Sequence, residues 1–327
     1  MMKKTFWGIL PVCLLALGLT SCAEAKVKEH THRLTDHFEH IDTIHATSQT
    51  FGVVPEEWML TERQLVCRTE NSEALYAVFD RKTLLPAGTF GRRGNGHLEW
   101  TMPHAVDNGA ESLIVMDNAS RKLYAVKDNA LNEVGVSCLQ DVVNDVKAIA
   151  YPVIGYVAST PEAQKLVVAN LQDGTHIDSV FVEAREGQSA MLDFSWTCSS
   201  HRLAMGFQYA NRFILCQTDA EGHIKAKDIY DGGGKSQQDK IYFTDVACDD
   251  YIYLLSQKQV NVNTGEGHSE IEVYTFEGRP VKKMVLDFIA FKMLLDKDGQ
   301  RLLMSSPADE DIRIVKIGTK TKIIGTK

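Results

Sequence analysis

A short pattern of apolar strands and polar turns recurs along most of the chain. In the clearest copy, three apolar segments, Gln64–Arg68, Leu75–Asp80 and Leu84–Phe90, are separated by polar turns. Short apolar runs bounded by turn residues are typical of β-strands joined by hairpins. No long run has the three- and four-residue apolar spacing of an amphipathic helix, so the pattern predicts an all-β protein. Five further copies begin with Ser112–Asp117, Ala148–Ala158, His201–Phe207, Tyr251–Ser256 and Arg301–Ser305.

The copies recur at a nearly even spacing. Their outermost strands end near Phe90, Val136, Val182, Tyr230 and Leu286, at intervals of 46, 46, 48 and 56 residues. A blade of a β-propeller has four strands and a repeat of about this length. We therefore predict an all-β fold, a six-bladed β-propeller with four-stranded antiparallel blades. A two-sheet sandwich is the alternative, although it would not need evenly spaced triplets.

The sixth copy has no evident fourth strand. The chain is nearly exhausted after Asp311–Ile317, and the segment Phe38–Ser48 could supply the missing strand. This closure would pair the first and last parts of the chain and hide strand edges. We predict that residues 38–318 form the propeller and that residues 319–327 form a C-terminal tail.

The first residues are predicted to be an export signal. Lys3 and Lys4 precede an apolar run of 15 residues, Thr5–Leu19, which ends in small residues. This is the organisation of a secretory signal peptide. The run is shorter than the roughly 20 residues of a membrane-spanning helix and contains Pro11, so we expect no permanent span. Residues 1–21 are therefore the predicted signal peptide.

The end of this run, Leu19-Thr20-Ser21-Cys22, resembles the lipobox of bacterial lipoproteins. The resemblance implies that Cys22 is acylated and becomes the first residue of the mature protein, with a membrane as its partner. Each buried methylene of such an anchor contributes about 0.8 kcal/mol. The alternative is a plain cleavage site with an accidental Cys22. Ala23 and Glu24 follow, without the Asp that retains some lipoproteins in the inner membrane. The resemblance thus implies the outer membrane of a Gram-negative bacterium, with the side left open.

The charge balance argues against nucleic acid as a partner. The formal net charge is −8, and it becomes −10 without residues 1–21, because Lys3 and Lys4 are lost and no acid is. A surface that neutralises phosphates needs clustered Lys and Arg in excess. The membrane anchor must therefore be hydrophobic, and we expect no binding to nucleic acid.

Residues 22–37 are predicted to be a flexible tether between lipid and domain. The chain is rich in histidine from Ala23 to about His45, and His30, His32, His37 and His40 are candidate ligands for zinc or copper. His-x-His on an extended chain places two imidazoles on one side, and His37 and His40 would share a helical face. A solvated linker is the simpler interpretation, since a flexible tether loses entropy when it closes around a metal.

The five cysteines beyond Cys22 form no recognisable framework. Their number is odd, they are widely spaced, and no C-x-x-C pair suggests a zinc or redox site. Each lies in or beside an apolar stretch, so we predict buried thiols. They are Cys67, Cys138, Cys198, Cys216 and Cys248.

Two further segments resemble one bacterial family. Gly91–Trp100 (GRRGNGHLEW) is similar to a junction of six-bladed propeller lipoproteins of the TolB-like and NHL-like type, and Glu270–Asp287 is similar to their common ending with an E-G-x-P turn. Most members have no assigned activity, so the resemblance implies the fold and says little about function. The chain departs from the family at His97-Leu98, where Pro-Gly is more frequent.

Several polar residues are candidates for a site. GRRGNG is not a nucleotide loop, because Trp100–Asn108 has no helix signal. It is interpreted as a turn, with anion binding by Arg92 and Arg93 as the alternative. Propeller hydrolases carry acids, Asn or His around the channel, often on a metal. The candidates of this kind, for which strand-end turns and solvated charges are the alternative, are His104, Asp107, Asp193 and Asp245.

Together these features predict a lipid-anchored cell-envelope propeller that is a binding or scaffolding module for a protein, peptide or glycan. No cofactor is expected for that role. The glycine-rich segment Asp231–Lys240 is the most irregular predicted loop, and loops of this kind often carry function. The alternative is a metal-dependent hydrolase or lyase of the propeller lactonase type, with calcium or zinc in the channel. No nucleophile elbow, H-E-x-x-H motif or EF-hand loop is present.

Overall fold

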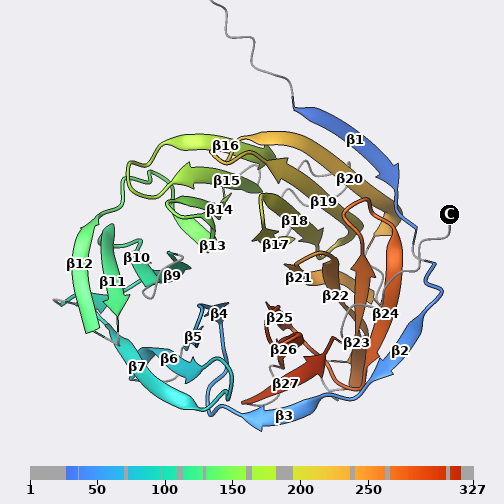
Figure 1. Ribbon diagram of the computed structural model, residues 1–327, viewed down its shortest axis with the longest axis horizontal. Coiled ribbons are helices and arrows are strands. Elements are labelled where there is room, and N and C mark those ends of the chain that lie inside the picture. The colour runs from blue at the N-terminus through green and yellow to red at the C-terminus, as the bar shows by residue number, and fades with distance from the viewer. Residues whose placement is uncertain are drawn as a thin grey trace, which may run out of the picture.

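The computed structural model describes residues 27–35, 37–69, 73–96, 98–108, 113–127, 130–159, 164–181, 194–235, 240–261, 266–306 and 310–317. In these residues the regular structure is entirely β, and six sheets stand radially around a central channel (Figure 1). The prediction of an all-β six-bladed propeller is confirmed, and the sandwich alternative is wrong. The described part of the chain contains no helix that is long and apolar enough to cross a membrane.

Each of the first three blades is a meander of four antiparallel strands that runs outward from the channel. Blade one contains β4 (Glu57–Leu60), β5 (Gln64–Arg68), β6 (Ala74–Asp80) and β7 (Pro86–Arg93), with the short β8 (Glu99–Trp100) added outside. Blade two contains β9 (Pro103–Asp107), β10 (Leu113–Asp117), β11 (Lys122–Lys127) and β12 (Ala130–Val136). Blade three contains β13 (Val143–Ala150), β14 (Val153–Ser159), β15 (Gln164–Asn170) and β16 (His176–Phe181).

The other three blades repeat this meander and also receive strands from the N-terminal part of the chain. Blade four contains β17 (Phe194–Ser199), β18 (Arg202–Phe207), β19 (Ala210–Thr218) and β20 (Ile224–Lys235), with β1 (Lys28–Arg33) outside. Blade five contains β21 (Lys240–Cys248), β22 (Ile252–Asn261), β23 (Glu266–Tyr274) and β24 (Pro280–Leu286), with β2 (Ile41–Ile44) outside. Blade six contains β25 (Lys292–Asp296), β26 (Arg301–Ser305), β27 (Asp311–Lys316) and β3 (Thr47–Thr50).

The predicted triplets correspond to the second, third and fourth strands of the blades. The pattern did not show the innermost strands, in which apolar residues mix with charged ones, as in Val143–Ala150 (VNDVKAIA). Residues 231–235 of the predicted irregular loop belong to β20, where Arg212 pairs with Asp231. Their glycines therefore extend a strand before residues 236–239, which lie outside the described part.

The ring is closed by the N-terminal segment. β3 pairs antiparallel with β27, from Ile314 opposite Thr47 to Asp311 opposite Thr50. The closing strand thus overlaps the expected segment 38–48 only at Thr47 and Ser48, while Ile41–Ile44 from that segment pairs parallel with β24. Blade six is built from both ends of the propeller sequence, so the outer edge of β27 is paired.

Part of the segment that we expected to be a flexible tether, residues 22–37, forms regular structure. Lys28–Arg33 forms β1, which pairs parallel with β20 and follows the outside of blade four (Figure 1). Leu34 and Phe38, which follow it, are 6% and 7% exposed and pack in the core between blades four and five. Two buried apolar side chains are enough to hold this polar segment on the rim. Residues 1–26, with the predicted signal peptide and Cys22, lie outside the described part, as do residues 318–327.

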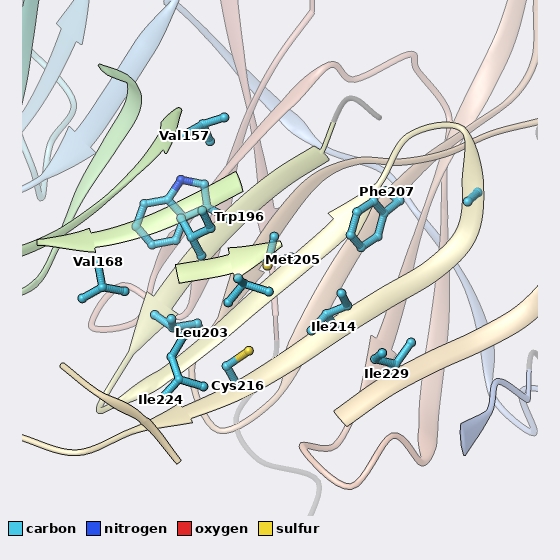
Figure 2. Close-up of a cluster of buried hydrophobic side chains, with 13 residues drawn as sticks. Val157, Val168, Trp196, Leu203, Met205, Phe207, Ile214, Cys216, Ile224 and Ile229 are labelled. Atoms are coloured by element: carbon cyan, nitrogen blue, oxygen red, sulfur yellow. The ribbon is translucent and has the colours of Figure 1, made fainter. Parts of the chain in front are cut away.

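The core is divided into six clusters, each between two adjacent blades. Figure 2 shows the cluster between blades three and four, where Trp196 of the innermost strand packs with Val157 and Val168. Gly155 gives the indole its space, because a Cβ there would lie 2.4 Å from the ring. Since both faces of each blade are covered, the blades form a rigid frame around the channel.

The cysteines of the described residues are free thiols, and their burial varies. Cys67, Cys216 and Cys248 are buried as predicted, and Cys198 is half-buried. The prediction was wrong for Cys138, which is exposed because it lies in the connection between blades two and three rather than in a strand.

Candidate functional site at the channel mouth

A cavity of about 340 Å³ occupies the channel and is lined by the innermost strand of every blade. A second hollow, of about 290 Å³, shares Glu56, Glu57, Asp145, Ser195 and Lys292 with it. The two spaces therefore meet at a polar surface. We call this surface the channel mouth and define it by the charged residues Glu57, Asp145, Asp245 and Lys292.

Glu57 begins β4 of blade one and is held by two neighbours. Arg68 Nη2 lies 3.0 Å from Glu57 Oε1, and His104 Nδ1 lies 3.1 Å from the same oxygen. Burial by itself would raise the pKa of Glu57, but the hydrogen bond and charge of His104, together with Arg68 and Lys147, hold that pKa below its usual value. Glu57 is therefore an anion at neutral pH.

Asp145 lies on β13 of blade three in an irregular backbone. The register with β14 shifts between Asn144 and Lys147, and Asp145 has a φ of 45°, in the left-handed region that costs energy for residues other than glycine. The Trp196 indole donates a hydrogen bond of 2.9 Å to the Asp145 carbonyl, and Lys147 forms an ion pair with the Asp145 side chain. Bulges of this kind redirect side chains next to functional sites.

Asp245 ties three blades together at the channel. It lies on β21, where the register with β22 also shifts between Ile241 and Asp245. Its Oδ1 accepts a 2.6 Å hydrogen bond from Ser195 Oγ of blade four, and its Oδ2 accepts one of 2.6 Å from the Met293 N–H of blade six. The side chain is buried, and both oxygens are already used by the protein.

Lys292 begins β25 of blade six and is exposed to the channel. Among the described residues its ammonium has no hydrogen-bond partner and no direct ion-pair partner. The carboxylate of Asp245, and after it those of Asp145 and Glu57, raise the pKa of Lys292 above its usual value, although burial opposes them. Lys292 is therefore a permanent cation that faces three carboxylates across a hollow.

The structure brings together three of the six predicted ligand-binding residues. Asp107 and Asp245 line the channel cavity, and the buried His104 contacts Glu57 through its ring nitrogen Nδ1. Asp193 lies outside the described residues. Arg92 and Arg93 are exposed on the outer strand of blade one, away from this group.

The junction that contains Arg92 and Arg93 has a structural role. These two residues pair with Glu99 and Trp100 of β8, and Trp100 is fully buried between blades one and two. Gly91 has a φ of +74°, and a Cβ there would lie 2.4 Å from the Trp100 ring. Gly91 therefore makes space for a buried indole, whereas Gly94 and Gly96 lie against the Glu99 side chain, and the turn interpretation fits this geometry.

The candidate metal-ligating histidines lie on the outer rim. His30 and His32 are on one side of β1, as expected for an extended His-x-His, at 3.5 and 2.8 Å from Asp228. His37 and His40 lie between β1 and β2 in chain without regular secondary structure, so the predicted helical face is wrong. Among the described residues, no group of three or more His, Cys, Asp and Glu is arranged to hold a metal ion.

Sequence reasoning missed Glu57, Asp145 and Lys292. Each is a charged residue near the start of an innermost strand, a position that the triplet pattern did not define. The available signal was a charged residue beside a short apolar run, as in DVKAIA and KMLLD. That signal also occurs at many solvent-exposed turns, so it cannot select these positions by itself.

No protein-family model matches the chain, and no curated protein matches it. Its fold is similar to that of a duf4221 family member from Bacteroides vulgatus, with 9% identity, a TM-score of 0.52, and coverage of 84% of this chain and 98% of that one. A candidate exported protein from Bacteroides fragilis also has 9% identity and a TM-score of 0.52, over 88% and 98% of the two chains. The Neurospora crassa Pan2 WD40 domain has 11% identity, a TM-score of 0.47, and coverage of 86% and 98%.

The similarities to the two Bacteroides structures show the fold alone. The six-bladed fold implied by the TolB-like and NHL-like resemblance is confirmed. None of the three structures is named for that family, so membership in it stays a prediction.

Proposed function

We propose that the protein is a lipid-anchored module of the bacterial outer membrane that binds a protein, peptide or glycan at its channel mouth. The observation that carries the proposal is a set of fixed opposite charges on a rigid frame. The pKa of Glu57 is lowered and that of Lys292 is raised, so both charges persist across neutral pH. A general acid or base needs a pKa near the working pH, whereas recognition benefits from permanent charges.

The surrounding fold supports this role. Ligand sites are concave, largely apolar and provided with a few well-placed polar groups, and the channel has this character. Asp145 and Asp245 are held by bulged strands, and the second of them by three neighbouring blades, so their positions do not depend on a ligand. A preorganised site of this kind loses little entropy on binding.

The binding function can be tested by site-specific photocrosslinking in the native envelope. A photoreactive residue at Thr197, which lines the channel, should give a discrete crosslinked product. The same residue at Asn132, exposed on the outer strand β12, is the matched control and should not give that product. Equal products from both positions would contradict the proposal. So would stoichiometric calcium or zinc together with hydrolysis of a lactone substrate, because that result favours the enzyme alternative.

The anchor is proposed from the Leu19–Cys22 motif and agrees with the description of the Bacteroides fragilis structure as a candidate exported protein. Replacing Cys22→Ser removes the thiol that would carry the lipid. The variant should leave the membrane fraction and become extractable without detergent. An Ala23→Ser variant is the control and should stay with the membrane. Membrane association of Cys22→Ser equal to that of the unmodified protein would contradict the anchor.

A further inference from the structure

We propose that the channel mouth binds a zwitterion with an apolar side chain, of the chemistry shared by apolar α-amino acids and short apolar peptides. This inference rests on the proposed binding function and specifies its ligand. It combines three features of the channel: a cation that lacks a direct partner, accessible carboxylates opposite it, and an apolar space below them.

The first feature is the Lys292 ammonium. An ammonium has three donors and no acceptor, and those of Lys292 contact no acceptor in the described residues. The three carboxylates that stabilise its charge act from a distance. The hollow of about 290 Å³ lies against this residue, so an acceptor from a ligand can reach the ammonium. A ligand carboxylate fits best, because a charge-assisted hydrogen bond is stronger than a neutral one.

The second feature is the set of carboxylates. Asp245 already accepts hydrogen bonds on both oxygens, so it acts on the ligand only through its charge. The Asp145 side chain is 40% exposed, and its ion pair with Lys147 involves Oδ1. Glu57 is 31% exposed, and its two contacts use Oε1. The accessible acceptors therefore belong to Asp145 and Glu57, and a ligand ammonium can bind between them.

The balance of charges selects against simpler ligands. Five carboxylates, those of Glu56, Glu57, Asp107, Asp145 and Asp245, face three cations in the two joined spaces. A plain anion that reached Lys292 would be repelled by the carboxylates, and a plain amine at the carboxylates would be repelled by Lys292. A zwitterion presents each charge to its opposite. The cations are Arg68, Lys147 and Lys292.

The third feature is the apolar wall of the inner cavity. Met59, Ala105, Ala148 and Leu294 line the space of about 340 Å³ and are only partly covered by protein. A ligand whose two charges bind at the mouth would place its side chain against this wall. Removal of apolar surface from water then adds affinity, and an apolar side chain is preferred to hydrogen.

The test is calorimetric titration of the full mature chain in detergent with four probes. L-Leucine carries both charges, L-leucinamide lacks the carboxylate, 4-methylpentanoate lacks the ammonium, and glycine lacks the side chain. Leucine should bind at least tenfold more tightly than each of the other three. Leucyl-leucine distinguishes the two sources, since tighter binding than leucine indicates a short peptide and weaker binding indicates the free amino acid.

Two variants assign the charges of the probe to the charges of the site. In Lys292→Met the preference for leucine over leucinamide should disappear, and in Asp145→Asn the preference for leucine over 4-methylpentanoate should disappear. Asn tolerates the left-handed backbone of Asp145, so this variant should fold. Lys127→Met, an exposed lysine at the end of β11, is the control and should bind as the unmodified protein does.

Failure of the zwitterion proposal can be distinguished from failure of the proposed binding function. If neither leucine nor leucyl-leucine binds, or if all probes bind equally, the zwitterion proposal is overturned. Equal weakening of every probe in both variants at unchanged Tm would also overturn it, because neither charge of the site would then recognise a particular charge of the probe. Crosslinking from Thr197 with no binding of these probes would leave the proposed function standing with a different ligand.

Discussion

The strand β25 of blade six carries a charged residue at each end. One of these charges is buried among ion-pair partners, and the other is open to a hollow. At the C-terminal end of the strand Asp296 is 1% exposed, and it lies 2.6 Å from Arg81 of blade one and 2.9 Å from Arg301. At the N-terminal end Lys292 has no direct partner among the described residues. The difference indicates two roles for charged residues of one blade. Charges enclosed by partners join blades, whereas a charge left open in a hollow is available to a ligand.

The enclosed end belongs to what we call the seam, formed by β3 together with Arg81, Asp296 and Arg301. Here blade six meets blade one, and the first and last parts of the propeller sequence come together. Burial would raise the pKa of Asp296, but Arg81, the Gly299 N–H and Arg301 outweigh it and hold the pKa below its usual value. The seam therefore contributes to stability, while the channel mouth contributes to recognition.

The largest loss of thermal stability is expected when the seam loses β3. A chain that begins at residue 51 lacks β1, β2 and β3 and exposes the edge of β27, so its Tm should fall by at least about 10 °C, since about 1 kcal/mol corresponds to about 2–4 °C in domains of somewhat smaller size. A chain that begins at residue 46 also lacks β1 and β2 but keeps β3, so it should lose less. Differential scanning calorimetry of the two chains makes the comparison. Equal Tm values would refute the role of β3 in ring closure.

The next effect is expected from the buried carboxylate of the seam. Asp296→Asn leaves two arginines without their shared anion, and loss of one partner of a buried pair costs about 3 kcal/mol. Asp298→Asn is a matched control, because Asp298 contacts the same Arg81 but its side chain is 81% exposed. Urea unfolding at pH 7 should show a large loss for the first variant and almost none for the second. Similar losses would mean that burial does not separate these two pairs.

The contribution of Asp296 should also depend on pH with a definite sign. Because its folded pKa is lowered, its stabilisation is present above the unfolded pKa of about 4 and is lost as the pH falls through the folded value. The difference in unfolding free energy between the unmodified protein and Asp296→Asn should therefore shrink below about pH 4. Urea unfolding at several pH values measures it. A difference that stays constant down to pH 3 would contradict the assigned pKa direction.

The smallest effect on stability is expected at the open end of β25. Lys292→Met removes a favourable but long-range attraction, which water in the channel weakens, so unfolding should become easier by less than about 1 kcal/mol. Urea unfolding should thus place this variant close to Lys127→Met and far from Asp296→Asn. A loss as large as that of Asp296→Asn would show that Lys292 is a structural residue.

Most of the fold could be predicted from the sequence because covered strands leave a strong pattern. The strands Gln64–Arg68 and Arg301–Ser305 match the expected segments, since both of their faces pack against other blades. The innermost strands could not be found in this way, because one face lines the channel. The strand β1 was also missed, because backbone pairing and the two anchors Leu34 and Phe38 hold it rather than an apolar face of its own.

The site was predictable only in part. Asp107 and Asp245 were found because each is an acid flanked by apolar residues, and His104 because it is a histidine near an expected inner strand. Asp145 and Lys292 were not found, because their role depends on which strands converge on the channel. Arg92 and Arg93 drew attention through their glycine-rich surroundings, which the structure explains by the close approach of Gly91 to Trp100 and of Gly94 and Gly96 to Glu99.

The central claim is that the open charges of the channel mouth recognise a partner. The most direct measurement is the yield of the Thr197 photocrosslink in cells that carry Lys292→Met, compared with cells that carry Lys127→Met at equal protein level. We expect the yield to fall at least tenfold with Lys292→Met and to stay unchanged with Lys127→Met. An equal yield from the two variants would contradict the account.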